Sequence, residues 1–158
     1  MLGAAPDILI EKMPDQKFAI ISSSWHPEIC YALITGAQKA LHEAGIQEVV
    51  IKKVAGSFEI PLASQYLFDQ GIDAIVAVGL VLRGQTPHFE YVCQAVTDGV
   101  MQVSLAAGKP IGFGVLMCDN LDQAIARAGL AGSKEDKGYD SAQAALNLLA
   151  LKASNKMK

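Results

Sequence analysis

A short segment in the middle of the chain has the residues of a phosphate-binding turn. From Gly79 to Thr86 the sequence almost fits the pattern GxxxxGK[ST], with Gln85 where the pattern has lysine. That lysine neutralises the terminal phosphates of a nucleotide, so we expect no nucleoside-triphosphate site, and the chain has no GxGxxG pattern for a dinucleotide. Gly84, Gln85 and Thr86 still lead into a predicted helix, whose free N–H groups favour a phosphate.

His88 lies in the first turn of that predicted helix. The positive end of the helix dipole disfavours an imidazolium ion, so we expect a neutral imidazole near pH 7 that can accept a proton. A histidine at such a place can also be held by packing alone. The adjoining turn favours the catalytic interpretation, and the segment predicts a site for a phosphorylated small molecule with proton transfer.

Other polar and aromatic residues give weaker signals. Glu59 begins a predicted helix, where the dipole favours a carboxylate whatever its function. Trp25, the only tryptophan, follows a predicted strand and is either a core residue or a platform for a planar ring. Arg127, near a helix C-terminus, is expected by default only to complement the helix dipole. We assign His26 and His42 structural roles.

The composition limits the classes of protein to consider. The 158 residues predict a single domain, 1–158, with an N-terminal segment over 1–16 and a frayed tail over 153–158. Charged residues form 18% of the chain and hydrophobic residues 51%, which suggests extra buried surface, as in an obligate oligomer. No apolar run is long enough to cross a membrane, and the net charge of −3 does not favour nucleic-acid binding.

The cysteines and the first residues indicate a compartment. Cys30, Cys93 and Cys118 lie far apart without any CxxC pair, so we expect reduced thiols rather than disulfides or a zinc site. Residues 1–7 show no basic segment followed by an apolar one, so no secretory signal is visible. Both observations predict a cytoplasmic protein.

Apolar runs and helical periods alternate along the chain. Four buried strands between helices predict an α/β fold with a parallel sheet and right-handed crossovers. Asp7–Glu11 is a candidate for one more strand, at an edge of the sheet or on a neighbouring chain. Thr86 and Asp119 are the expected N-caps of two helices. The strands are predicted at 18–22, 49–54, 74–78 and 111–116, and the helices at 27–44, 58–69, 87–107, 120–128 and 139–151.

Parallel strands bind ligands beyond their carboxyl ends. The segments that follow the predicted strands carry the residues singled out above. They are 22–26, 54–59, 81–88 and 116–119.

Several motifs together resemble those of lumazine synthases. They are VAGSFEIPL at 54–62, VLRGQTPHFEYV at 81–92, FGVL at 113–116, RAG at 127–129 and KG at 137–138. The resemblance covers about residues 17–152 in order and spacing. GSFEIP and RGxTPHFxYV are highly specific in combination.

The resemblance implies a flavodoxin-like three-layer sandwich that assembles into pentamers or larger shells, with active sites between adjacent subunits. It implies condensation of 5-amino-6-(D-ribitylamino)uracil with 3,4-dihydroxy-2-butanone 4-phosphate. The products are 6,7-dimethyl-8-ribityllumazine, phosphate and water. It implies no cofactor and no metal, and it makes riboflavin synthase a candidate partner.

For the uracil ring, the resemblance implies contacts from two subunits. Trp25 would stack on the pyrimidine, at a position where the family has an aromatic residue. Main-chain groups of Val81 and Leu82 would pair with the edge of the ring. Phe113 of the neighbouring subunit would close the ring pocket.

For the ribityl chain, the resemblance implies binding by the backbone around Ser57 and Phe58 and by the Glu59 carboxylate. Lys137 of the neighbouring subunit would line the site. These residues carry no such assignment from spacing alone.

For the phosphate, the resemblance implies binding by Gln85 and Thr86 at the helix N-terminus. Arg127 of the neighbouring subunit would contact the same phosphate. His88 would carry protons between the reacting groups. The catalytic assignment therefore agrees with the one drawn from the position of His88 alone.

A few positions depart from the common pattern of the family. His26 replaces the Asn of many members, Ala55 the usual Pro, Met117 a common Thr, and Asp136 the usual Asn before Lys-Gly. The loop over 129–137 is slightly longer than in many members, which leaves the size of the oligomer open.

Two other functions remain open at this point. One is a catalytically weak relative that binds or stores flavin, with Trp25 as a stacking platform. The other is a non-enzymatic shell or scaffold. The presence of His88, Arg127 and Glu59 favours the enzyme over both.

Overall fold

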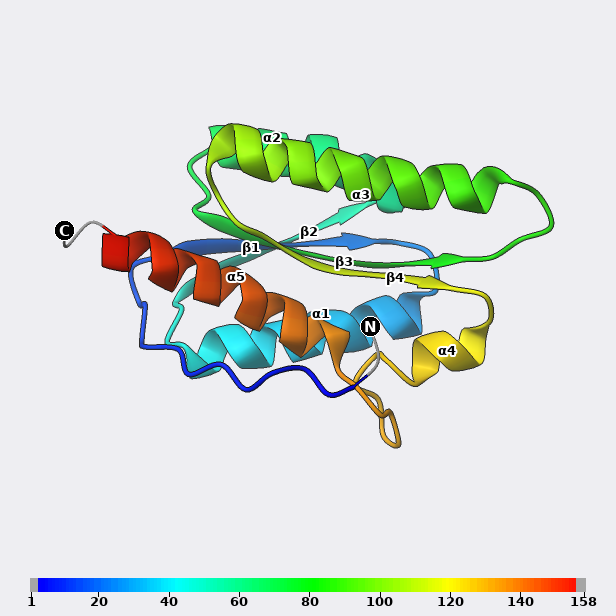
Figure 1. The fold of residues 1–158 in the computed structure, drawn as a ribbon, viewed down its shortest axis with the longest axis horizontal. Coiled ribbons are helices and arrows are strands. Elements are labelled where there is room, and N and C mark those ends of the chain that lie inside the picture. Colours follow the sequence, from blue (N-terminus) through cyan, green and yellow to red (C-terminus); the bar gives the residue numbers. More distant parts are fainter. Residues whose placement is uncertain (1–2, 156–158) are drawn as a thin grey trace.

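The computed structural model describes residues 3–155, which form one four-stranded parallel sheet with helices on both faces (Figure 1). The strand order is β2-β1-β3-β4, which reproduces the first four strands of the flavodoxin-like order. The elements are β1 (Lys17–Ser23), α1 (Pro27–Glu43), β2 (Glu48–Val54), a 3-10 turn η1 (Ser57–Glu59), α2 (Ile60–Asp69), β3 (Ala74–Leu82), α3 (His88–Ala107), β4 (Ile111–Cys118), α4 (Leu121–Ile125) and α5 (Lys137–Asn155).

The central strands divide their side chains between two hydrophobic cores. On β1, Phe18 and Ile20 face the core shared with α1 and α5, whereas Ala19 and Ile21 face the core shared with α2 and α3. Side chains of successive strand residues point to opposite faces, so a strand that is covered on both sides is apolar at every position. Figure 1 shows the resulting layers, with α2 and α3 above the sheet and α1, α4 and α5 below it. The predicted three-layer α/β fold is confirmed.

The prediction of four buried strands is wrong for β2. This strand lies at an edge of the sheet, and Val50 and Ile51 are about two-fifths exposed. The helices of this chain cover the central strands and leave Val50 and Ile51 open to solvent, whereas Val49 and Val54 pack partly against the two cores. An exposed apolar edge is a surface that can pair with or pack against another chain.

Helix α5 lies very close to both the sheet and α1. A Cβ atom on Gly112 of β4 would collide with the carbonyl oxygen of Ser141, and one on Gly138 would collide with that of Leu33. Both neighbours are backbone atoms, which cannot move aside as a side-chain end can. Glycine at these two positions therefore sets the distance of α5 from the sheet and from α1.

The helix ends differ slightly from those predicted. The amides of Glu90 and Tyr91 both donate to the carbonyl oxygen of Pro87, so Pro87 rather than Thr86 is the N-cap of α3. Asn120, rather than Asp119, caps α4, since its side-chain oxygen accepts a hydrogen bond from the Gln123 amide at 3.0 Å. Asp and Asn are equally good caps, and the local sequence does not distinguish two neighbours.

The two chain ends also differ from expectation. Residues 7–11 form no strand in the sheet of this chain, and a strand added to a neighbouring chain stays a prediction. Helix α5 includes residues 153–155, which the sequence placed in a frayed tail. Residues 156–158 of that tail lie outside the described residues.

Candidate active site

A cavity of about 770 Å³ lies at the carboxyl ends of the strands. Helices α1 and α3 leave β1 and β3 toward opposite faces of the sheet (Figure 1). In parallel sheets such a reversal opens a crevice between the two strand ends. The volume falls in the range of sites that bind small molecules. The cavity is lined by Trp25, His26, Ala55, Gly56, Ser57, Phe58, Glu59, Leu80, Val81, Leu82, Arg83, His88, Tyr91 and Val92.

The loop between β1 and α1 carries an exposed aromatic ring to the cavity. The Trp25 side chain is 68% exposed, so this residue is not part of a core. Its carbonyl oxygen accepts a hydrogen bond from Cys30 Sγ at 3.1 Å, and its indole lies beside Gly56. An exposed indole on an anchored backbone can stack on a planar ring.

His26 was assigned a structural role from the sequence, yet it lines the same cavity as Trp25. Its φ is 53°, and among the described residues it is the non-glycine residue with positive φ. Left-handed backbone is unfavourable for most side chains and is better tolerated by Asn, Asp and His. The sequence did contain a signal for this conformation, because many family members have Asn at this position and Asn tolerates left-handed backbone.

The turn after β2 places five consecutive residues, 55–59, in the cavity wall. Glu59 Oε2 accepts a hydrogen bond from the backbone N–H of Gly56 at 2.9 Å, which holds the carboxylate in place. Ser57 is 4% exposed, and its hydroxyl has no hydrogen-bond partner within residues 3–155. An unpaired buried hydroxyl is unfavourable, so Ser57 indicates a position where a ligand or water supplies the missing partner. Phe58 is largely exposed at the mouth.

The end of β3 offers unpaired backbone to the cavity. Residues 74–78 of this strand pair with β1, but Gly79 to Leu82 pair only with β4. On the side facing β1, the backbone of Leu80 to Leu82 therefore has no neighbouring strand within the described chain. Val81 and Leu82 can offer main-chain donors and acceptors to a planar heterocycle there.

His88 is the first residue of α3, and its side chain is exposed to the cavity. The first amides of a helix carry a partial positive charge, which favours an anion beside this turn. Gln85 and Thr86 precede the helix, are exposed, and do not line the cavity itself. The predicted phosphate-binding residues thus border the site at its outer end.

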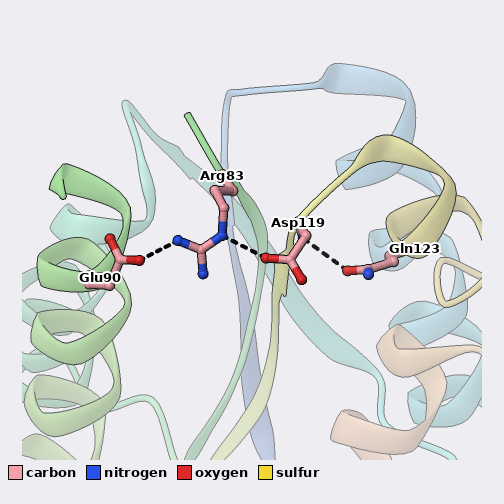
Figure 2. Close-up of polar contacts among 4 residues, drawn as sticks. All are labelled: Arg83, Glu90, Asp119 and Gln123. Carbon is pink, nitrogen blue, oxygen red and sulfur yellow. Dashed lines mark hydrogen bonds and ion pairs between the residues drawn. The ribbon is translucent and has the colours of Figure 1, made fainter. Parts of the chain in front are cut away.

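Arg83 was not assigned a role from the sequence, although it lines the cavity. Its guanidinium makes ion pairs with Glu90 of α3 and with Asp119 after β4, the second at 2.6 Å between Nε and Oδ1 (Figure 2). The hydrogen bonds from Arg83 lower the pKa of both carboxyls, and they raise the pKa of the guanidinium. These partners lie 7 and 36 residues away, a pairing that no local pattern predicts.

Besides Gln85 and Thr86, three more predicted residues lie outside the cavity. Phe113 is on edge strand β4 and is 41% exposed. Arg127 donates from Nη1 to the Gln123 carbonyl oxygen at 2.9 Å, at the end of α4. Lys137, the first residue of α5, pairs with Glu135 at 2.8 Å and Asp140 at 3.2 Å. The hydrogen bond to Glu135 raises the pKa of Lys137, which keeps the ammonium charged.

The cysteines and acidic groups define no further centre. The thiols of Cys30, Cys93 and Cys118 are free, and burial raises the pKa of Cys93 and of Cys118. Within residues 3–155, no three His, Cys, Asp or Glu side chains gather as a metal site requires. None of the helices in that range is both long enough and apolar enough to span a membrane.

A flavodoxin-like sandwich with a cavity at the ends of its parallel strands defines a protein that binds small molecules. The profile of the family described as 6,7-dimethyl-8-ribityllumazine synthase matches residues 15–153. The chain belongs to this family, and the resemblance inferred from its motifs is confirmed.

Curated relatives are similar over most of their length. A 6,7-dimethyl-8-ribityllumazine synthase from Streptomyces coelicolor is 50% identical over 142 residues, which cover 90% of this chain and 88% of the relative. The protein of the same name from Paenarthrobacter aurescens is 52% identical over 136 residues, covering 86% and 84%. That from Streptomyces avermitilis is 49% identical over 142 residues, covering 90% and 88%.

Proposed function

We propose that this protein condenses 5-amino-6-(D-ribitylamino)uracil with 3,4-dihydroxy-2-butanone 4-phosphate in riboflavin biosynthesis. The products are 6,7-dimethyl-8-ribityllumazine, phosphate and water. The observation that carries the proposal is that an exposed indole, a fixed carboxylate and a helix-terminal imidazole line one and the same cavity. Family membership supports the same reaction.

The uracil ring lies between Trp25 and the unpaired end of β3. The indole stacks on the flat ring, while the backbone of Val81 and Leu82 pairs with the polar edge. A pyrimidinedione has alternating donors and acceptors along that edge, and a free strand edge presents the same alternation. This arrangement aligns the ring and its two amino nitrogens with His88.

The ribityl chain runs along the turn after β2. Its hydroxyls give the Ser57 hydroxyl the partner that it lacks in the free protein. They also donate to the Glu59 carboxylate, which the Gly56 N–H already holds in place. A hydrogen bond to a charged group is stronger than one between neutral groups, so Glu59 contributes most to this part of the affinity. The backbone at Phe58 completes the contact.

The phosphate binds at the N-terminus of α3, beside Gln85 and Thr86. The uracil amine attacks the ketone and water leaves to give an imine, phosphate is then eliminated, and the second nitrogen closes the ring with loss of water. Each step moves protons, which the His88 imidazole accepts and returns. Much of the acceleration comes from holding the two substrates side by side.

A neighbouring copy of the chain completes the site. Phe113 and Arg127 are exposed and Lys137 is half-buried, and all three reach the cavity of an adjacent subunit. Arg127 stabilises the departing phosphate dianion there. The open edge of β2 and the exposed aromatic residues support assembly into pentamers or larger shells. The protein acts in the cytoplasm, with riboflavin synthase as its partner.

An assay with both substrates tests this function. Purified protein is mixed with the uracil and the butanone phosphate, and formation of the lumazine is followed by absorbance and by release of phosphate. Turnover with equal amounts of lumazine and phosphate is the expected result. Tight binding of flavin without turnover would instead identify a storage protein. If the protein neither forms the lumazine nor binds flavin, the scaffold function is favoured.

A further inference from the structure

The side chain of Arg83 joins three segments at the rim of the cavity. Its Nη1 pairs with the Glu90 carboxylate in the first turn of α3, and its Nε donates to Asp119 Oδ1 at 2.6 Å (Figure 2). The guanidinium carbon lies 4.2 Å from the centre of the Phe89 ring. Asp119 is in turn held by its backbone N–H, which donates to Gln123 Oε1 at 2.9 Å. Arg83 therefore ties the start of α3 to the segment after β4.

The backbone of Arg83 is fixed independently of these contacts. Its N–H donates to the Cys118 carbonyl oxygen at 2.9 Å, which extends the pairing of β3 with β4 by one residue. The guanidinium thus projects from an anchored point on the sheet. A planar group with several fixed donors can hold two carboxylates at defined angles, which an ammonium group cannot do.

The charges of this cluster argue against direct binding of phosphate by Arg83. One guanidinium faces two carboxylates, Glu90 and Asp119, and hydrogen bonds from Arg83 are made to both. The three groups together carry a net negative charge, which repels a phosphate dianion. Direct binding of the phosphate by Arg83 is therefore unfavourable while both carboxylates are in place.

We propose that Arg83 is a positioning residue, which acts on the reaction by fixing the first turn of α3. This inference rests on the proposed function, because the turn carries His88 and follows the phosphate-binding residues Gln85 and Thr86. Four residues separate Arg83 from His88 along the chain, and the ion pair with Glu90 closes that loop. Misplacing a catalytic group by about 1 Å can lower a rate by about a hundredfold.

The test compares four variants with the wild type. Arg83→Met keeps the apolar stem over Phe89 and removes both ion pairs, while Arg83→Lys keeps one charge. Glu90→Gln and Asp119→Asn each remove one carboxylate charge. Lys17→Met is the matched control, since it removes an exposed ion pair with Glu48 at the opposite end of the sheet. Circular dichroism checks that each variant folds.

For a positioning role, we expect Arg83→Met to lower kcat and raise KM for the butanone phosphate by about tenfold each. Glu90→Gln and Asp119→Asn should also lower kcat and raise KM, each by a smaller factor than Arg83→Met. The effect of Arg83→Lys should be larger than that of either carboxylate variant and smaller than that of Arg83→Met. Adding Glu90→Gln to Arg83→Met should change little more, because the two residues act through one contact. The affinity for the uracil should be unchanged.

Two kinetic results would overturn the proposal. If Glu90→Gln or Asp119→Asn lowers KM for the phosphate substrate, the freed guanidinium binds phosphate directly. If both leave kcat and KM unchanged, the ion pairs have no role in positioning.

Hydrogen exchange of the peptide spanning residues 83–92 separates this inference from the proposed function, since it requires no turnover. Faster exchange in Arg83→Met but not in Lys17→Met is expected. Unchanged exchange in Arg83→Met would also reject the positioning role. If instead the proposed function is wrong, the wild-type protein itself will show no turnover with the two substrates.

Discussion

The Glu59 carboxylate and the Gly56 backbone are joined by a hydrogen bond of 2.9 Å, which fixes the acidic group before any ligand binds. The bond spans three residues and closes the turn between β2 and α2. A substitution that keeps an acceptor at this position should therefore preserve the turn while it removes the charge. Glu59→Gln meets this condition, whereas Glu59→Ala would remove both the charge and the acceptor.

Mixing two variants should show that Arg127 acts in the site of a neighbouring subunit. Glu59→Gln and Arg127→Ala proteins, each of low activity, are unfolded together and reassembled. In a ring of equally mixed subunits, about a quarter of the interfaces combine an intact Glu59 with an intact Arg127 from the adjacent copy. We expect activity well above that of either parent, measured as lumazine formation.

In the control for this experiment, the Arg127→Ala protein is mixed with a chain that carries both Glu59→Gln and Arg127→Ala. Such mixtures contain no interface with both groups intact and should stay inactive. If the first mixture is no more active than this control, Arg127 serves its own subunit or none.

His88→Ala should lower turnover by about ten- to a thousandfold with substrate binding largely kept. The imidazole carries protons, but holding the two substrates together supplies much of the rate. Steady-state kinetics with both substrates measures the change. His42→Ala is the control, because His42 lies in the last turn of α1 and does not line the cavity. An unchanged kcat for His88→Ala would remove this residue from the mechanism.

The fold was predictable where burial is complete. Strands β1 and β3 are covered on both faces, so their apolar runs at 18–22 and 74–78 identify them directly. The exposure of β2 was not predictable in the same way. Its sequence has the composition of a strand, but strand order depends on how distant segments pair, which a local pattern does not contain.

The candidate site was predictable only for the residues whose place follows from the order of strands and helices. His88, Glu59 and Trp25 follow strand ends or begin helices, so the topology alone brings them to one edge of the sheet. The pairing of Arg83 with Asp119 joins the ends of two different strands and depends on the folded geometry. The left-handed backbone of His26 is likewise a property of the tight loop that it closes.

Asp136→Asn should stabilise the protein at neutral pH. Asp136 precedes α5, and its Oδ1 accepts a hydrogen bond from the Tyr139 amide at 2.9 Å. Burial raises the pKa of this carboxyl, so the folded state binds the proton more tightly than the unfolded chain does. Stability is then highest below the ordinary pKa and falls as pH rises toward the raised value. Asn is an equally good helix cap and carries no charge.

Thermal unfolding at several pH values measures this effect. The Tm of Asp136→Asn minus that of the wild type should grow as pH rises from about 4 and then level off above the raised pKa. A gain of about 1 kcal/mol corresponds to about 2–4 °C in a chain of this length. A difference that does not change with pH would show that the charge of Asp136 has no effect on stability.

Trp25 should make this protein bind riboflavin appreciably. The indole is 68% exposed at the cavity that holds the uracil ring in our proposal, and the isoalloxazine ring of a flavin is a larger planar ring of related shape. Stacking of aromatic rings contributes about 0.5–1.5 kcal/mol beyond the burial of surface, so Trp25→Ala should weaken flavin binding by about tenfold. Trp25→Tyr keeps an aromatic ring, so its affinity for flavin should lie between those of the wild type and of Trp25→Ala.

Titration of riboflavin, followed by quenching of its fluorescence, gives the dissociation constants of these three proteins. Because the indole is exposed, its removal should leave Tm nearly unchanged, so a loss of affinity cannot come from unfolding. Tyr31→Ala is the matched control, since Tyr31 is 71% exposed on α1 and lies outside the cavity. Equal dissociation constants for the wild type and a folded Trp25→Ala protein would exclude stacking, and a fall in Tm without a selective loss of affinity would make Trp25 a packing residue.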